Sequence, residues 1–270
     1  MKKQQLDFET AVFYFFRLPD WKRRAAIIGG PVAVFMIIMI FPMQFIGLIP
    51  FLGWIVQLLF MILYYAVLII TTIYISGYML EVAAKVKKNQ DPGTIVVEEY
   101  QSKLLNGVKY FGANFIFMIP YIVLIILAFV ILFTTVFSNI NSEKVSGFLP
   151  LAMVIYLVLF AFALLYIIIV TIYFQAAAVN FLKLNRFSAF FEFKENWEIL
   201  KRNLLNFIIM PLILLVVGLV AAFAMIFAEI TIFCCIGIVL FPMVFAIIFV
   251  YQPHVSGHLL GQIARFEEEK

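Results

Sequence analysis

Long uncharged blocks are the feature that most constrains how this chain can fold. Residues 25–80 contain no Asp, Glu, Lys or Arg, which makes a run of 56 uncharged residues. Four more such blocks follow, at residues 110–142, 145–182, 203–228 and 230–264. A transmembrane helix needs about 20 apolar residues to cross about 30 Å of hydrocarbon. The first block is therefore long enough for two spans, and each of the others for one.

These blocks predict an all-α polytopic membrane bundle of six helices, with a turn at the Pro- and Gly-containing residues 41–50. The predicted spans are residues 25–41, 53–80, 111–137, 149–178, 204–228 and 232–256. Only 13% of the residues are charged, whereas about a quarter are charged in soluble domains. A membrane β-barrel would need stretches of about ten residues that alternate apolar and polar, and the continuous apolar runs disfavour it.

The basic residues indicate the orientation, because Lys and Arg are retained on the cytoplasmic side of a membrane. With six spans, eighteen of the nineteen basic residues fall on one side, and only Lys144 falls on the other. The eighteen lie in residues 1–24, 81–110, 181–203 and 261–270. We therefore expect both termini in the cytoplasm. Residues 1–24 lack the apolar core of a signal peptide, so we expect no cleavage there.

Three segments on the predicted cytoplasmic side have the apolar periodicity of amphipathic helices. Their stripes are Phe8, Val12, Phe15 and Pro19, then Val97, Tyr100, Leu104, Val108 and Phe111, and finally Phe190, Phe193, Trp197, Leu200 and Leu204. Such helices lie in the membrane interface, which is the placement we expect here. Docking on a cytoplasmic partner is the alternative.

Two recurring features suggest a parallel repeat of three hairpins with the same orientation. The outgoing spans contain Pro31, Pro120 and Pro211, which are 89 and 91 residues apart. The returning spans end in small residues, which allow helices to approach closely. These are Ser76-Gly77, Ala176-Ala177-Ala178 and Ser256-Gly257. The alternative is that Pro and Gly are frequent in all membrane helices.

The repeat divides a single membrane domain, residues 1–270, into five segments. They are an amphipathic N-terminal segment 1–24, hairpins at 25–80, 94–180 and 187–260, and a cytoplasmic tail 261–270.

Few polar residues lie within the predicted spans, and these are the candidates for an intramembrane polar site. Glu229 is the only acid in a long apolar stretch, where it is either a proton or cation site or an acid at the outer interface. Gln57 and Gln175 also lie in spans. Contact with a substrate is one interpretation of these amides, and hydrogen bonding between helices is the commoner one.

His254 and His258 are spaced to share one helix face, as a metal-binding pair requires. The acid of a His-Glu-x-x-His motif is missing between them, so a polar helix end is the alternative interpretation. Cys234 and Cys235 are adjacent, which disfavours a relaxed disulfide and favours a role as small apolar side chains. We expect no metal and no cofactor.

The sequence contains no phosphate-binding loop and no G-x-S-x-G nucleophile motif. The cytoplasmic loops are too short and too mixed in charge for nucleic-acid binding. We therefore expect no catalytic residues and no enzymatic activity. The expected partners are the lipid bilayer, its anionic head groups and another membrane protein or complex.

Three short strings resemble an uncharacterised prokaryotic membrane family, the domain of unknown function 4013. They are G-Y-M-L-E-V-A-A-K-V at 77–86, L-N-G-V-K-Y at 105–110 and H-L-L-G-Q at 258–262. The resemblance covers about residues 40–265, although Asn106 stands where the family often has an acid and the loop spacing is altered around 91–93. It implies a multi-pass protein of the prokaryotic inner (plasma) membrane and brings no established activity or site residues.

Three classes of function remain open. The expected one is a non-enzymatic structural or accessory subunit of a membrane complex, because the spans carry little chemistry. A small transporter or permease is the alternative, supported by the repeat and the prolines but weakened by the scarcity of charge within the spans. An intramembrane enzyme acting on lipid would rest only on His254, His258 and Glu229.

Overall fold

The computed structural model describes residues 5–40, 52–140, 148–231 and 236–269, and all of the regular structure in these residues is helical. The α-helices are α1 (Phe8–Arg17), α2 (Trp21–Ile40), α4 (Leu52–Lys87), α5 (Tyr100–Ile140), α6 (Phe148–Leu184), α7 (Phe193–Arg202), α8 (Leu204–Ile230) and α9 (Gly237–Glu268). Two short 3-10 helices, η1 (Pro92–Thr94) and η2 (Phe187–Phe191), lie between them. The predicted all-α class is confirmed.

Five of these helices are long and apolar enough to cross a membrane: α4, α5, α6, α8 and α9. The remaining predicted span, 25–41, corresponds to α2, which begins with the basic residues Lys22, Arg23 and Arg24. The described apolar part of α2, residues 25–40, rises about 24 Å at 1.5 Å per residue, against a hydrocarbon thickness of about 30 Å. The structure therefore supports five spans, and the sixth stays a prediction.

Several predicted features lie outside the described residues: the turn at 41–50, Lys144, and the pair of Cys234 and Cys235. Pro31, Pro120 and Pro211 lie inside α2, α5 and α8, respectively.

The three amphipathic segments differ in structure. The first and the third contain the separate short helices α1 and α7. The second differs from the prediction, because α5 runs without a break from Tyr100 through the whole span. Lys103 and Gly107 of this stretch face α4, so protein contacts continue the helix where a separate interfacial helix is predicted.

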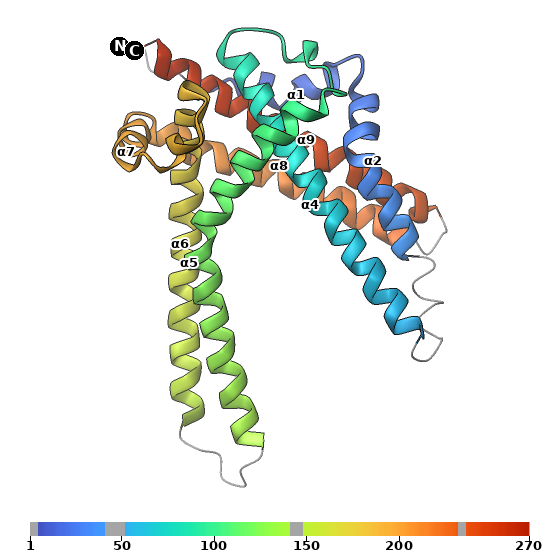
Figure 1. Cartoon of the computed structure of the whole chain (residues 1–270), viewed down its shortest axis with the longest axis vertical. Helices are drawn as coiled ribbons and strands as arrows, with labels where there is room; N and C mark the ends of the chain where they lie inside the picture. Colours follow the sequence, from blue (N-terminus) through green and yellow to red (C-terminus); the bar gives the residue numbers. More distant parts are fainter. Residues whose placement is uncertain (1–4, 41–51, 141–147, 232–235, 270) are drawn as a thin grey trace.

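The helices fan out from one end of the molecule (Figure 1). α5 and α6 run side by side as a long hairpin that projects away from the rest, and α4 slants away from that hairpin. α9 is the central helix, because it packs against α1, α2, α4 and α8. α2 packs more extensively on α9 than on α4. The arrangement as three equivalent hairpins therefore stays a prediction.

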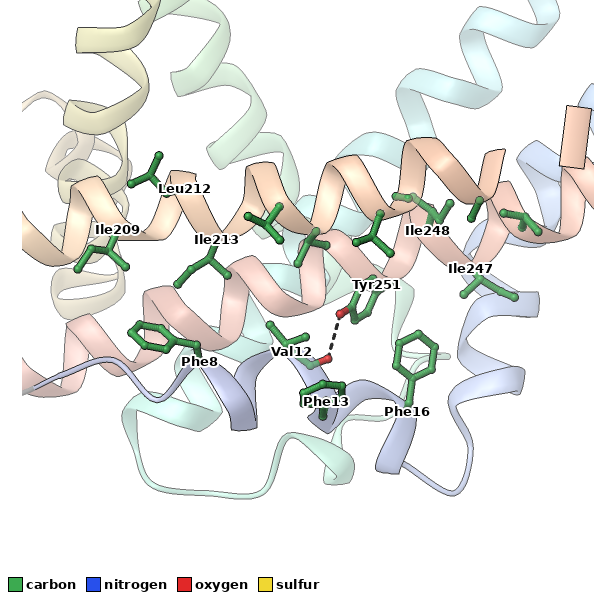
Figure 2. Close-up of a pocket in the computed structure, with 16 residues that line it drawn as sticks. Phe8, Val12, Phe13, Phe16, Ile209, Leu212, Ile213, Ile247, Ile248 and Tyr251 are labelled. Atoms are coloured by element: carbon green, nitrogen blue, oxygen red, sulfur yellow. Dashed lines mark hydrogen bonds between the residues drawn. The ribbon is translucent and has the colours of Figure 1, made fainter. Parts of the chain in front are cut away.

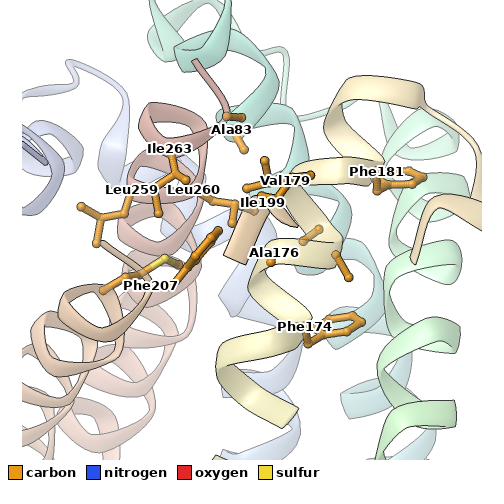
Figure 3. Close-up of a cluster of buried hydrophobic side chains, with 14 of the residues drawn as sticks. Ala83, Phe174, Ala176, Val179, Phe181, Ile199, Phe207, Leu259, Leu260 and Ile263 are labelled. Carbon is orange, nitrogen blue, oxygen red and sulfur yellow. The ribbon is translucent and has the colours of Figure 1, made fainter. Parts of the chain in front are cut away.

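The end from which the helices fan out carries the short elements α1, η1, η2 and α7, together with the last turns of α9 (Figure 1). We call this end the charged base. Ion pairs there join different helices, at nitrogen–oxygen distances of 2.5–2.9 Å. They include Lys87–Glu268, Lys103–Glu81 and Arg202–Glu267. Close-up views show α1 lying along α9 (Figure 2) and buried side chains of α4, α6, α7 and α9 meeting in one cluster (Figure 3).

Close helix crossings hold the base together. Gly77 of α4 and Gly107 of α5 face each other, and a Cβ atom on either would overlap a backbone carbonyl of the opposite helix. Gly257 and Gly261 are one turn apart on α9, and both allow α9 to approach α4 closely. A Cβ atom on Gly261 would lie 2.5 Å from the carbonyl oxygen of Ala83. The close approach predicted from the small residues is confirmed at these crossings.

Asparagine residues end two of the long helices at the base. Asn89 follows α4 with a φ of 57°, and Asn185 follows α6 with a φ of 51°. Asn tolerates this left-handed conformation better than most residues other than Gly, and it commonly stops a helix there. The chain can then turn back toward η1 and η2, which places both short helices against the ends of the spans.

Candidate functional site

The three predicted intramembrane polar residues have different surroundings. Gln57 is exposed near the start of α4, and Glu229 is exposed near the end of α8. Gln175 of α6 is half-buried and lines a pocket that neither of the others lines. The structure therefore brings none of the three together, and only Gln175 contributes to a pocket.

The pocket around Gln175 has a volume of about 260 Å³ and lies between α5, α6, α8 and α9. We call it the polar pocket. Its polar side chains are Tyr110 and Asn114 of α5, Thr171 and Gln175 of α6, and Ser256 of α9. Its apolar lining comes from Met118, Phe174, Ala178, Met210, Leu214 and Leu260. Three helices thus direct hydroxyl and amide groups into one cavity at their junction.

The polar groups of this pocket have no hydrogen-bond partners among the described residues. None of the five side chains makes a hydrogen bond to any described residue, and Oε1 of Gln175 is buried without a partner. An unpaired buried carbonyl costs about 1–3 kcal/mol. Because no Asp, Glu, Lys, Arg or His lines the pocket among the described residues, its chemistry is that of neutral hydrogen bonding.

The two predicted histidines belong to the charged base. His254 and His258 both pack against the ring of Tyr14, with ring-centre distances of 5.9 and 5.6 Å. Nδ1 of His254 lies 3.0 Å from the Tyr78 hydroxyl, and Nδ1 of His258 lies 3.1 Å from Nε2 of Gln262. Within the described part of the chain, no three His, Cys, Asp or Glu side chains group together as metal ligands. The pair therefore connects α1, α4 and α9 structurally.

A buried arginine extends this network to α2. Arg24 is almost fully buried and donates from Nε to both carboxylate oxygens of Asp20, at 2.9 and 3.0 Å. Its Nη2 donates to the carbonyl oxygen of Gly93 at 2.8 Å, and its Nη1 lies 3.4 Å from the hydroxyl of Tyr78. Since Tyr78 also bonds to His254, one chain of hydrogen bonds joins α2, α4 and α9.

Gln262 attaches α1 to α9. Its Oε1 accepts from the backbone N–H of Asp7 at 2.7 Å, and its Nε2 donates to the carbonyl oxygen of Asp7 at 2.9 Å. The Asp7 carboxylate caps α1 by accepting from the backbone N–H and the hydroxyl of Thr10, at 3.0 and 2.5 Å. These two bonds lower the pKa of Asp7 below its ordinary value of 3.8. The ionised carboxylate therefore stabilises α1 at neutral pH.

A larger and almost wholly apolar groove lies between α1, α8 and α9 (Figure 2). Its volume is about 750 Å³, and Phe8, Phe13 and Phe16 of α1 line one side. Across the groove, the hydroxyl of Tyr251 on α9 donates a hydrogen bond to the carbonyl oxygen of Val12 on α1 at 3.1 Å. The groove offers apolar contact and no reactive side chain.

Sequence reasoning finds Gln175 but misses the other polar residues of the pocket. A signal for them exists: Tyr110 and Asn114 are four residues apart on α5, and Thr171 and Gln175 are four apart on α6. That spacing places each pair on one helix face. The partner on α9, Ser256, carries no such signal, because only the packing of α9 brings it to the junction.

Five apolar spanning helices that meet at a hydrogen-bonded base define a multi-pass membrane protein. The chain belongs to the DUF4013 family of proteins of unknown function, whose family model matches residues 59–230. The resemblance seen at 77–86 and 105–110 is therefore confirmed, and the string at 258–262 lies beyond the matched region. No curated protein and no solved structure matches the chain.

Proposed function

We propose that this protein is a non-enzymatic accessory subunit of a membrane complex, and that the α5–α6 hairpin is the part that meets its partner. The observation that supports this is the difference in exposure between helices. In the most apolar stretch of α5 only 6% of the residues are buried, against 28% in that of α9. The hairpin projects from the molecule (Figure 1). Many of its apolar side chains, such as Phe133 and Phe162, are exposed.

The proposed placement is a prokaryotic inner (plasma) membrane, with α2 as the sixth span and the charged base in the cytoplasm. The distribution of basic residues supports it, because an even number of spans keeps eighteen of nineteen on one side. Exposed Lys22 and Arg23 at the start of α2 would then lie near anionic head groups. The hydrogen bonds of Arg24 and of the Nδ1 atoms of His254 and His258 support a structural role for the base.

Site-specific photo-crosslinking tests the proposed contact. A photoreactive residue would replace Phe133 of α5 or Phe162 of α6, and the matched control would replace Phe223 of α8, which is similarly exposed. We expect one protein of constant mass to crosslink at both hairpin positions and not at the control. Crosslinking to lipid alone at the hairpin, or the same set of proteins at all three positions, would contradict the proposal.

A permease is the second candidate, and the polar pocket is the observation that favours it. A transported solute would have to reach the pocket from both sides of the membrane. Cysteine placed at Asn114 would then react with aqueous maleimide added to either side. Reaction from neither side would exclude transport through this pocket.

A further inference from the structure

The hydroxyl groups of the spans fall into two classes. Side chains of Thr and Ser in apolar helices normally donate to a carbonyl one turn earlier. Thr71, Thr72 and Ser76 do so here, with distances of 2.7–2.8 Å to the carbonyl oxygens of residues 67, 68 and 72, and Thr134 and Thr135 do the same. Thr171 and Ser256 make no such bond to any described residue. Both line the polar pocket, where Thr171 is exposed and Ser256 is half-buried, and neither hydroxyl is used within its own helix.

The same holds for the amides of the pocket. Gln175 has a buried Oε1 without a partner, and Asn114 also makes no hydrogen bond to a described residue. A group of this kind is stable within an apolar bundle only when it is hydrogen-bonded. Five polar side chains without a hydrogen bond to a described residue line one cavity of about 260 Å³, and one of them, Gln175, has a buried carbonyl oxygen, so the cavity is suited to an occupant that forms hydrogen bonds.

The chemistry of the occupant follows from the charges. No ionised side chain lines the pocket among the described residues, so an ion would enter it without a counter-charge, at a large desolvation cost. The lining offers both donors and acceptors, from Tyr110, Thr171 and Ser256 as hydroxyls and from Asn114 and Gln175 as amides. An uncharged partner with hydroxyl or carbonyl groups can pair with all of them.

The pocket lies within the spanning part of the bundle, near the charged base. Gln175 lies nine residues before the end of α6 at Leu184, which corresponds to roughly 14 Å along the helix. The pocket is lined by residues of the α5–α6 hairpin together with residues of α8 and α9. We infer that the polar pocket binds a small uncharged group bearing hydroxyls or carbonyls, either as a free polyol or as the glycerol region of a neutral lipid. This inference is independent of the proposed accessory function.

The probes are glycerol for a free solute and dioleoylglycerol for a neutral lipid, each offered to the full-length chain in lipid nanodiscs. Saturation-transfer NMR would measure bound glycerol, and native mass spectrometry would count bound dioleoylglycerol. We expect saturable binding of one of the two, which identifies the source. Thr171→Val and Gln175→Leu should each weaken it about tenfold, the effect of one lost hydrogen bond of about 1.4 kcal/mol. Thr72→Val is the matched control and should bind normally, because that hydroxyl is bonded within its own helix.

Thermal stability without a probe separates a binding role from a structural one. Because the substituted groups make no hydrogen bond to a described residue, both pocket variants should be as stable as the wild type or more stable. A marked loss of stability would contradict a binding role. Absence of saturable binding, which would leave only water in the pocket, or unchanged binding by the pocket variants would also overturn the inference. Equally strong binding of glycerol 3-phosphate would overturn its uncharged character.

Discussion

The charged base and the outer half of the α5–α6 hairpin bury different kinds of side chain. The base buries polar groups with their partners, among them Arg24, Lys103 and the amide nitrogen of Asn196. The outer hairpin, residues 120–137 and 151–165, buries little except alanines such as Ala128 and Ala163. Specific contacts within the chain therefore fix the base, whereas the outer hairpin depends on an apolar environment around it.

This difference has a physical origin. Hydrogen bonds and ion pairs specify one arrangement when every partner is present. Leu and Phe on the outside of a membrane helix have no such preference, because lipid tails are as apolar as the side chains of another helix. We therefore expect substitutions in the base to change folding and substitutions on the outer hairpin to change association.

The largest expected effect is at the crossing of α4 and α5. Gly107→Ala would drive a methyl group into the carbonyl of Ile73, so α4 and α5 would have to separate. We expect a loss of about 3 kcal/mol, at the upper end of the usual cost of overpacking. Thermal unfolding of the purified protein in detergent would measure it.

Gly112→Ala on the same helix is the matched control, because no atom lies within 4 Å of the new methyl group. It should be neutral or should stabilise α5 by up to about 1 kcal/mol through helix propensity. Equal melting temperatures for the two variants would mean that the crossing is not closely packed.

Breaking a buried ion pair of the base should have the next largest effect. Lys103→Met removes the partner of Glu81 at 2.9 Å and the donor to the carbonyl oxygen of Val96. We expect about 3 kcal/mol of destabilisation, the lower end for buried pairs, because Glu81 retains some exposure. Adding Glu81→Gln should restore part of the stability. The exposed pair of Arg17 and Glu9 is the comparison, and Arg17→Met should cost less than about 1 kcal/mol.

The smallest expected effect is a pH response of α1. The pKa of Asp7 is lower in the folded chain than in the unfolded chain, so the stabilisation is present above pH 3.8 and is lost as the pH falls through the folded pKa. Hydrogen exchange in α1 should therefore show weaker protection in acid, by about 1 kcal/mol for loss of the cap. Asp7→Asn keeps a capping side chain without a charge, and its α1 should lack this pH response. An equal response in both proteins would assign the change to another group.

The sequence alone was sufficient for much of the fold. The apolar blocks predict five helices, α4, α5, α6, α8 and α9. For most of them, the predicted end that lies away from the base is within a few residues of the observed end. It does not predict that α4 continues to Lys87 or that α5 begins at Tyr100, because contacts at the base extend these helices. It also does not predict that α9 is central, since the apolar pattern of a helix does not specify its neighbours.

The candidate site was less predictable, for a related reason. An isolated amide such as Gln175 is visible in an apolar run, but whether it pairs with another helix depends on packing. His254 and His258 have the spacing of a metal pair, yet Tyr78 and Gln262 occupy one nitrogen of each ring. Gln262 lies one turn after His258 on α9, whereas Tyr78 reaches His254 only through the close crossing of α4 and α9 near Gly257.

Cysteine accessibility in oriented membrane vesicles tests the central claim most directly. The chain has two cysteines, so replacing both gives a background for single cysteines at Lys194 in the base and at Phe133 in the outer hairpin. We expect a membrane-impermeant maleimide to label position 194 only from the cytoplasmic side and to leave position 133 unlabelled from either side. Labelling of position 133 from water, or of position 194 from outside, would contradict a cytoplasmic base that carries a membrane-embedded hairpin.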